Sequence, residues 1–253
     1  MIDAHCHLEQ KEFDEDRDRL IEEWKEKLDA IVTCCCHPED WKLSLNLVER
    51  YKGFVFLTAG LHPEYAHEFE EKEIERFISV LQDAKTKLVA IGEVGLDFYW
   101  VSEREKRKRQ VETFRKFIKL AEELHLPLVI HARNAFREVI EELESYNCKR
   151  VLMHLFGDPS LLSRVVENGW LISIGPIIKR SEKHRRLVKE CPLENILTET
   201  DSPWFGEGER GTPLNVSIVI EKIAEIKGLS PEEVDEITTK NAANFYGLRL
   251  TKE

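Results

Sequence analysis

The sequence predicts an α/β fold, a single-domain (β/α)8 barrel of the TIM type that spans residues 1–253. Apolar runs rich in β-branched residues recur along the chain, and charged segments whose apolar residues have helical spacing separate them. Several of the runs are apolar almost throughout, which is typical of parallel strands covered on both faces. A chain of 253 residues also has the length of one such barrel.

The predicted strands follow one another along most of the chain. We expect them at residues 1–5, 30–35, 54–60, 88–94, 128–131, 151–154, 170–174 and 196–200. The segments between them have the spacing of helices. In 114–121 apolar residues recur every three or four positions, and Pro127 ends that helix before the next strand. Strands that alternate with helices form a parallel sheet, and eight such units suit a closed barrel.

Two further helices are expected after the last strand, around 216–227 and 231–245. The second begins with Ser230 as its N-cap and Pro231 as its first residue, a favourable pair. An open doubly wound sheet is the alternative fold. It usually carries a glycine-rich phosphate turn after its first strand, where this chain has a His-Cys-His segment at 5–7. We find no linker or internal repeat, so we expect one domain.

The composition is that of a globular protein, with 42% hydrophobic and 34% charged residues. No apolar run approaches the roughly 18 residues that a membrane span needs, so we expect no membrane partner. Asp3 and His5 interrupt the apolar residues at the start of the chain, so we expect no signal peptide and a cytoplasmic location. We also expect a monomer or weak oligomer. The net charge of −11 argues against attraction of nucleic acid to the whole surface, but not to a local patch.

Three consecutive cysteines, Cys34 to Cys36, end the second predicted strand. Successive residues of a strand face opposite sides, so Cys35 points away from the other two and the three thiols cannot converge. No Cys-x-x-Cys pair accompanies them. We therefore interpret them as small apolar residues of a protein in a reducing compartment.

Polar residues follow directly after the apolar runs, at the strand ends where barrels of this kind build their active sites. His5 and His7 stand at the end of the first predicted strand, and residues two apart on a strand face the same side. The candidate ligands at the strand ends are His5, His7, Glu93, His131, His154 and Asp201. Each of these residues, taken alone, could have an ordinary structural role, such as a hydrogen-bonded core histidine or a turn cap. Together they would be several costly buried polar groups at one mouth, which a metal centre explains.

Six ligands are too many for one tetrahedral ion and suit two divalent ions with a carboxylate between them. We expect Glu93 to bridge the ions, with His5, His7 and Asp201 on one of them. His131 and His154 would complete the second. Mixed nitrogen and oxygen ligation fits Zn²⁺, Mn²⁺ or iron and fits Mg²⁺ less well, and the sequence does not choose between them.

Longer motifs resemble the TatD family of metal-dependent deoxyribonucleases, within the amidohydrolase superfamily. They are "DAHCHL", "GLHPEYA", "AIGEVGLDF", "LAEELHLPLVIHAR", "ILTETDSPW" and "TKNAANFYGL", and they extend over nearly the whole chain. The resemblance implies a (β/α)8 barrel, a two-metal site on the same six residues, and hydrolysis of DNA, typically as an exonuclease from the 3′ end. The implied cofactors are two divalent ions (Mg²⁺, Mn²⁺ or Zn²⁺), and the implied partner is DNA that is single-stranded or offers a 3′ end.

The expected reaction is phosphodiester hydrolysis by an activated water. Asp201 is the expected general base, and Glu93 is the second expected catalytic residue. His62 and Arg133 lie on predicted strand ends and are expected to hold the phosphate, although ordinary loop hydrogen bonding explains them equally well. Trp204 is expected to stack a base, with a packing role as its alternative.

Two other functions remain open from the sequence. The first is an ester or amide hydrolase on the same barrel, such as a D-aminoacyl-tRNA deacylase. Amide hydrolases of this superfamily often use a carboxylated lysine at the end of strand 4 or 5, and this chain has Glu93 at the former and no lysine at either. The second is an inactive barrel used as a binding scaffold, which would be expected to have lost at least one ligand.

Overall fold

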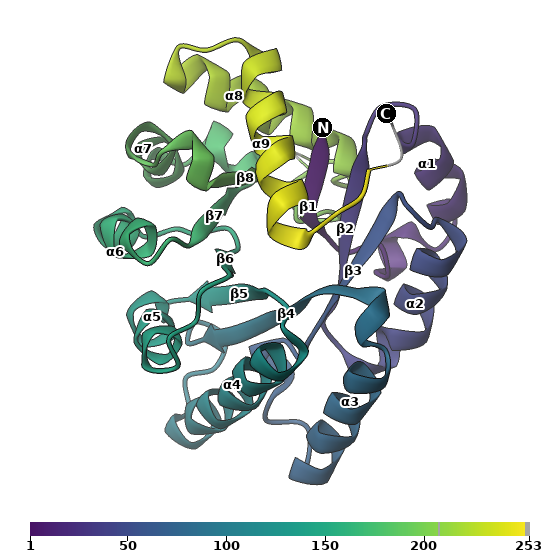
Figure 1. Cartoon of the computed structure of the whole chain (residues 1–253), viewed down its shortest axis with the longest axis vertical. Coiled ribbons are helices and arrows are strands. Elements are labelled where there is room, and N and C mark those ends of the chain that lie inside the picture. The colour runs from purple at the N-terminus through teal and green to yellow at the C-terminus, as the bar shows by residue number, and fades with distance from the viewer. Residues whose placement is uncertain (207, 251–253) are drawn as a thin grey trace.

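The protein forms a barrel of parallel strands in the computed structural model, which describes residues 1–206 and 208–250 (Figure 1). The strands lie side by side in chain order, and each neighbouring pair from β1 to β8 is parallel. Their bounds are β1 Ile2–Cys6, β2 Ala30–Cys35, β3 Val55–Ala59, β4 Leu88–Asp97, β5 Leu128–Arg133, β6 Val151–Met153, β7 Leu171–Ile174 and β8 Ile196–Thr198. The predicted fold class is confirmed.

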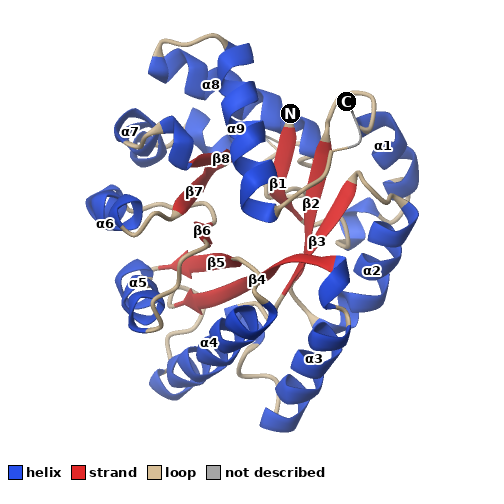
Figure 2. Cartoon of the chain, in the orientation of Figure 1, coloured by secondary structure: helices blue, strands red, loops and turns tan. Residues whose placement is uncertain are grey.

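Helices form an outer layer around the strands (Figure 2). Their bounds are α1 Arg17–Trp24, α2 Trp41–Arg50, α3 Glu71–Asp83, α4 Arg104–Leu124, α5 Phe136–Ser145, α6 Leu162–Glu167, α7 Glu182–Glu190, α8 Val216–Lys227 and α9 Pro231–Tyr246. The two predicted C-terminal helices are confirmed as α8 and α9, and Ser230 caps α9 by accepting a hydrogen bond from the backbone of Glu233. None of the helices in the described part of the chain is long and apolar enough to cross a bilayer.

Backbone hydrogen bonds close the barrel between β8 and β1. The Asp201 N–H donates to the His5 carbonyl at 3.0 Å, and the His7 N–H donates to the Ser202 carbonyl at 2.8 Å. The last strand, β8, ends at Thr198 and is shorter than the predicted 196–200. The two bonds lie beyond its end. The bonds bring the residues after β8 against the end of β1.

Apolar side chains fill the barrel interior, and α9 covers one end of it. Phe245 and Tyr246 of α9 pack against strand residues that come early in each strand, such as Ile2 and Ala30. The Tyr246 hydroxyl also donates to the Ala4 carbonyl at 2.8 Å. Figure 1 shows α9, in yellow, lying across the barrel. The amino ends of the strands are therefore sealed, which leaves the carboxyl ends for a site.

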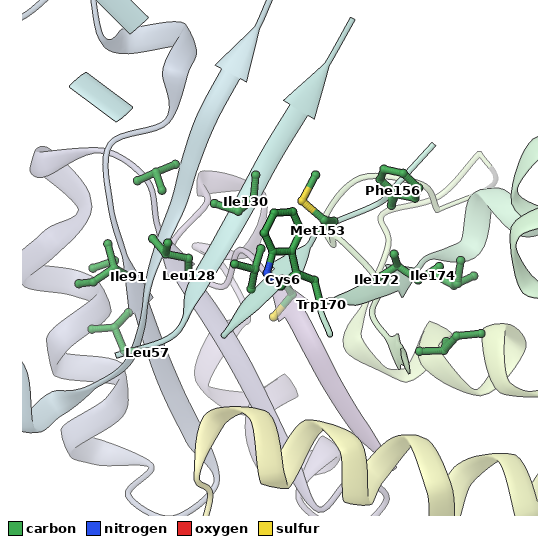
Figure 3. Close-up of a cluster of buried hydrophobic side chains, with 14 of the residues drawn as sticks. Cys6, Leu57, Ile91, Leu128, Ile130, Met153, Phe156, Trp170, Ile172 and Ile174 are labelled. Atoms are coloured by element: carbon green, nitrogen blue, oxygen red, sulfur yellow. The ribbon is translucent and has the colours of Figure 1, made fainter. Parts of the chain in front are cut away.

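A larger apolar layer lies between the strands and the outer helices. Figure 3 shows part of this layer, with labelled side chains from the strands and from the segments between them. They are Cys6, Leu57, Ile91, Leu128, Ile130, Met153, Phe156, Trp170, Ile172 and Ile174. All of them are nearly fully buried, so the strands are fixed by apolar packing on the helix side as well.

β4 is longer than predicted and continues to Asp97 instead of ending at residue 94. Gly95 makes this continuation possible because its φ is +146° and a Cβ there would lie 2.0 Å from the His131 carbonyl oxygen. Only glycine allows so close an approach of β4 to β5. The glycine thereby sets the distance between the strands that carry Glu93 and His131.

Replacing Gly95 by Ala is expected to lower the free energy of unfolding by about 2–5 kcal/mol, through backbone strain and steric overlap with β5. Gly169→Ala is the control, because Gly169 also has a positive φ, of 72°, but open space around its Cβ position. It is expected to cost only about 1 kcal/mol. Urea denaturation of both variants measures the difference, and equal losses would show that the overlap with β5 is relieved without cost.

Candidate metal centre

Two imidazoles from β1 and its end meet at the mouth of the barrel. His5 and His7 are both buried, and their Nε2 atoms lie 3.1 Å apart. The expected convergence of these residues is confirmed, because alternate residues of the strand share a face. Two ring nitrogens this close to one another could both ligate one cation.

Glu93 of β4 lies between two groups of imidazoles. Its Oε2 atom is 3.5 Å from His5 Nε2 and 3.7 Å from His7 Nε2. Its Oε1 atom is 2.7 Å from His131 Nδ1 and 3.5 Å from His154 Nε2. The two oxygens of a single buried carboxylate therefore face different pairs of nitrogen atoms.

Asp201 approaches the first pair of imidazoles from the residues after β8. Its Oδ1 atom is 3.3 Å from His7 Nε2 and 3.6 Å from His5 Nε2. The backbone bond from its N–H to the His5 carbonyl holds this position, and its φ is +53°. The six residues that the sequence singled out are thus brought together around Glu93.

Three of these imidazoles have a carboxylate at the ring nitrogen that faces away from Glu93. Glu9 Oε1 is 3.1 Å from His7 Nδ1, Asp97 Oδ2 is 2.9 Å from His131 Nε2, and Glu199 Oε1 is 2.9 Å from His154 Nδ1. A carboxylate at one nitrogen holds the N–H there, so a cation that displaces the proton of the other nitrogen would find a lone pair facing Glu93. This is the outer arrangement that orients histidine ligands toward a metal ion.

His62, from the segment after β3, also reaches the cluster. Its Nε2 atom is 3.2 Å from His131 Nδ1 and 3.7 Å from Glu93 Oε1. Its Nδ1 atom accepts a hydrogen bond from the backbone N–H of Glu64 at 3.2 Å. The neutral ring therefore carries its proton on Nε2 and presents a donor to the mouth. Burial, followed by the charge of His131, lowers the pKa of His62 to about 3, so the ring is neutral at pH 7.

The charges of the cluster are strongly coupled. Burial alone would raise the pKa of Glu93, but the nearby His154 and the hydrogen bond from His131 hold it well below its usual value. Burial likewise would lower the pKa values of His131 and His154, yet the carboxylates around each ring raise both to about 9. The surrounding carboxylates thus favour the protonated, positively charged form of these imidazoles. A divalent cation bound between the rings would supply that positive charge in place of the protons.

The mouth itself is a cavity of about 650 Å³ whose walls include exposed aromatic rings. Trp204, after β8, is 45% exposed with its ring 4.8 Å from that of His7. Trp100, which follows β4 and lines the cavity, is 59% exposed, and the neighbouring Tyr99 is 52% exposed. The guanidinium of Arg133 lies over both rings, 4.0 Å from that of Tyr99 and 5.3 Å from that of Trp100. Arg133 is therefore a cation at the mouth of the barrel.

Sequence reasoning missed part of this site. It assigned no role to Glu9, Asp97 and Glu199, although each lies within two residues of a predicted ligand or in the same strand as one. It also missed the aromatic pair Tyr99 and Trp100. A carboxylate two residues from a candidate ligand is the signal that could have found Glu9 and Glu199.

Comparisons with known proteins show which family this chain resembles. The family described as TatD related DNase matches residues 2–247. The human protein named Deoxyribonuclease TATDN3 is 38% identical over 97% of this chain and 94% of its own length. The Methanocaldococcus jannaschii protein named "Uncharacterized metal-dependent hydrolase MJ1582" is 37% identical over 98% of each chain. The crystal structure of YJJV, a TatD homologue from Escherichia coli K12, superposes with a TM-score of 0.90 at 25% identity, over 98% of each chain.

A parallel barrel with converging histidines and carboxylates at its carboxyl mouth defines the class of metal-dependent hydrolases. Within that class, the chain belongs to the TatD family. It is a metal-dependent hydrolase of that family.

Proposed function

We propose that this protein hydrolyses the phosphodiester bonds of DNA from a 3′ end, using two divalent ions. The observation that carries the proposal is the position of Glu93, whose two oxygens face separate imidazole pairs. A shared carboxylate of this kind is the usual bridge of a two-metal hydrolytic centre. The human relative named a deoxyribonuclease supports DNA as the substrate.

The donor atoms fit two ions. One ion would be held by His5, His7, Glu93 and Asp201, and the other by Glu93, His131 and His154. The carboxylates behind His7, His131 and His154 support this assignment, because they hold the outer N–H and free the nitrogen that faces Glu93 for a cation. The mixture of nitrogen and oxygen donors favours Zn²⁺ or Mn²⁺ over Mg²⁺.

Bound ions supply Lewis-acid stabilisation of charge on the phosphoryl group and lower the pKa of water. Asp201 then acts as the general base and accepts the proton of the attacking water on its carboxylate. Burial opposes ionisation of this carboxyl, but the hydrogen bond from His7 and the charge of His154 lower its pKa. Asp201 is therefore unprotonated at neutral pH, as a base must be.

The remaining residues of the mouth bind and orient the substrate. His62 donates from Nε2 to a phosphate oxygen, because its Nδ1 already accepts the Glu64 N–H. Arg133 is exposed at the rim and provides a positive charge for a neighbouring phosphate. Trp204 follows β8 and Trp100 follows β4, which lie on opposite sides of the ring of strands. Their exposed rings suit unpaired bases, which favours a single-stranded substrate or a frayed 3′ end.

Replacing Arg133 by Ala is expected to raise the KM for a single-stranded oligonucleotide about tenfold while kcat changes little, because a charged contact to phosphate is worth about 1.5–3 kcal/mol. Arg137→Ala is the matched control. It removes the same charge from an exposed position on α5, four residues further along the chain. Steady-state kinetics on one oligonucleotide compares them. A KM that is unaltered in the Arg133 variant, or raised equally in both, would remove Arg133 from the binding site.

Replacing Glu199 by Gln is expected to weaken metal binding by about 10–100-fold, because its carboxylate lies 2.9 Å from His154 Nδ1 and orients that ring. Competition with a chromophoric chelator measures the affinity. Glu194→Gln, an exposed change in the turn just before β8, serves as the control and is expected to bind metal like the original protein. Equal affinities in the two variants would mean that Glu199 does not orient His154.

The experiment that tests the function is degradation of single-stranded DNA by chelator-stripped protein, with Mg²⁺, Mn²⁺ or Zn²⁺ added back. Two substrates are compared, one labelled at the 5′ end and one at the 3′ end. Removal from the 3′ end releases the 3′ label at once as mononucleotide and shortens the 5′-labelled strand stepwise. A folded, metal-loaded protein that leaves both substrates intact would contradict the proposal and would direct the search to ester substrates such as aminoacyl-tRNA.

A further inference from the structure

A pair of thiols lies beside the hydrolytic centre and has no part in the reaction proposed above. Cys34 is the fifth residue of β2, and Cys36 follows the end of that strand. Cys34 Sγ accepts a hydrogen bond from the Glu93 N–H at 3.1 Å and donates to the Gly92 carbonyl at 3.3 Å. Cys36 Sγ lies 3.5 Å from His7 Nδ1 and lines the wall of the mouth cavity. Cys36 thus lies at the ring nitrogen of His7 that faces away from Glu93, and Cys34 lies against the backbone of Glu93.

The third thiol of this run lies elsewhere. Cys35 Sγ donates to the His37 carbonyl at 3.3 Å, so it faces away from the other two as the alternation of the strand predicts. All six cysteines of the chain are free thiols. The interpretation of the run as ordinary apolar residues therefore holds for Cys35, but Cys34 and Cys36 share their surroundings with an imidazole.

The spacing of these donors suits a metal ion. The sulfur atoms of Cys34 and Cys36 and a ring nitrogen of His7 all lie within 4.8 Å of one another. Zn–S and Zn–N bonds of about 2.3 and 2.1 Å at a tetrahedral angle place sulfur and nitrogen about 3.6 Å apart. The 3.5 Å between Cys36 Sγ and His7 Nδ1 matches that edge. Two thiolates and an imidazole are donors that thiophilic ions prefer.

We propose that Cys34, Cys36 and His7 form a thiolate site that binds Zn²⁺ beside the hydrolytic centre and shares His7 with it. His7 would take part through Nδ1, while its Nε2 faces Glu93 and Asp201. The ion replaces the two thiol protons and the Nδ1 proton that His7 now shares with Glu9 at 3.1 Å. Because Cys36 borders the cavity, the ion reaches the site from the mouth. Zn²⁺ bound there takes the place of Glu9 at His7 Nδ1. Because His7 also belongs to the hydrolytic centre, occupation of the thiolate site affects that centre.

Cobalt absorption tests this site without any substrate. Co²⁺ replaces Zn²⁺ in such sites, and thiolate ligands give it a strong sulfur-to-cobalt charge-transfer band in the near ultraviolet. The histidines and carboxylates of the hydrolytic centre give no such band. Titration of the chelator-stripped full chain with Co²⁺ is therefore expected to produce the band once ions reach the thiols, and added Zn²⁺ is expected to remove it.

Three single variants locate the band. Cys36→Ser is expected to reduce it at least tenfold, and Cys34→Ser is expected to do the same. Cys35→Ser, an adjacent and equally conservative change on the opposite face, is expected to retain it. Circular dichroism checks that each variant is folded, and Cys36 is the more tolerant position because it borders the cavity.

Two results would overturn the proposal. One is the absence of the band from the folded original chain at saturating Co²⁺, and the other is an undiminished band in Cys36→Ser. Neither depends on DNA hydrolysis, so a failure of the thiolate site is distinct from a failure of the nuclease function.

Discussion

Replacing Glu93 by Gln is expected to reduce the rate of DNA hydrolysis by at least about 10³-fold. The amide keeps the shape of the side chain and removes its charge from a site where both oxygens face imidazoles. An amide nitrogen cannot ligate a cation, so one of the two ions loses a ligand and both lose a shared anion. In protein loaded with Mn²⁺, which prefers carboxylate donors to thiolates, the bound metal is accordingly expected to fall from two ions per chain to one or fewer.

Initial rates on end-labelled DNA and elemental analysis of dialysed protein together measure the effect of the Glu93 substitution. Glu68→Gln makes the same chemical change at an exposed position after β3 and is expected to leave both quantities unaltered. A Glu93→Gln protein that still binds two ions and cleaves within about tenfold of the original rate would eliminate the bridging role.

Replacing Asp201 by Asn is expected to lower kcat by about 10²–10⁴-fold with a smaller change in KM, because the proton acceptor is lost. This change differs in kind from that at Glu93. The asparagine oxygen can still approach His5 and His7 as Asp201 Oδ1 does, at 3.6 and 3.3 Å, so metal binding is expected to survive in large part.

The pH dependence separates a general base from a simple ligand at position 201. Hydroxide in solution needs no base to remove a proton, so the residual rate of Asp201→Asn is expected to rise steadily with pH. The original enzyme has its carboxylate already ionised at neutral pH and is expected to gain less over the same range. Parallel pH profiles for the two proteins would assign Asp201 to metal binding alone.

The fold and much of the donor set could be predicted because both depend on simple periodicities. The interval between apolar runs predicted the eight strands, and β2 and α8 were predicted at their observed bounds. β4 was predicted three residues too short, since it continues to Asp97. In the structure Gly95 allows β5 to approach β4 closely. That approach is a tertiary contact, and the local sequence does not encode it.

The outer parts of the site could not be predicted because they depend on which ring nitrogen faces which neighbour. His62 presents Nε2–H only because the Glu64 backbone occupies its Nδ1. The distance from Cys36 to His7 depends on how β1 lies against β2, where the register shifts between Asp3 and Cys6. Alternation along the strand predicted that Cys34 and Cys36 share a face, but not that the face borders His7.

The most direct test of the central claim is anomalous diffraction from crystals of the protein soaked in Mn²⁺, an ion that prefers carboxylate donors to thiolates such as those of Cys34 and Cys36. We predict two peaks on either side of the Glu93 carboxylate, one beside His5, His7 and Asp201 and the other beside His131 and His154. In crystals of Glu93→Gln at least one of these peaks should disappear. A single peak at the mouth of the original protein, or ions bound only away from Glu93, would contradict the two-ion centre on which the proposed hydrolysis rests.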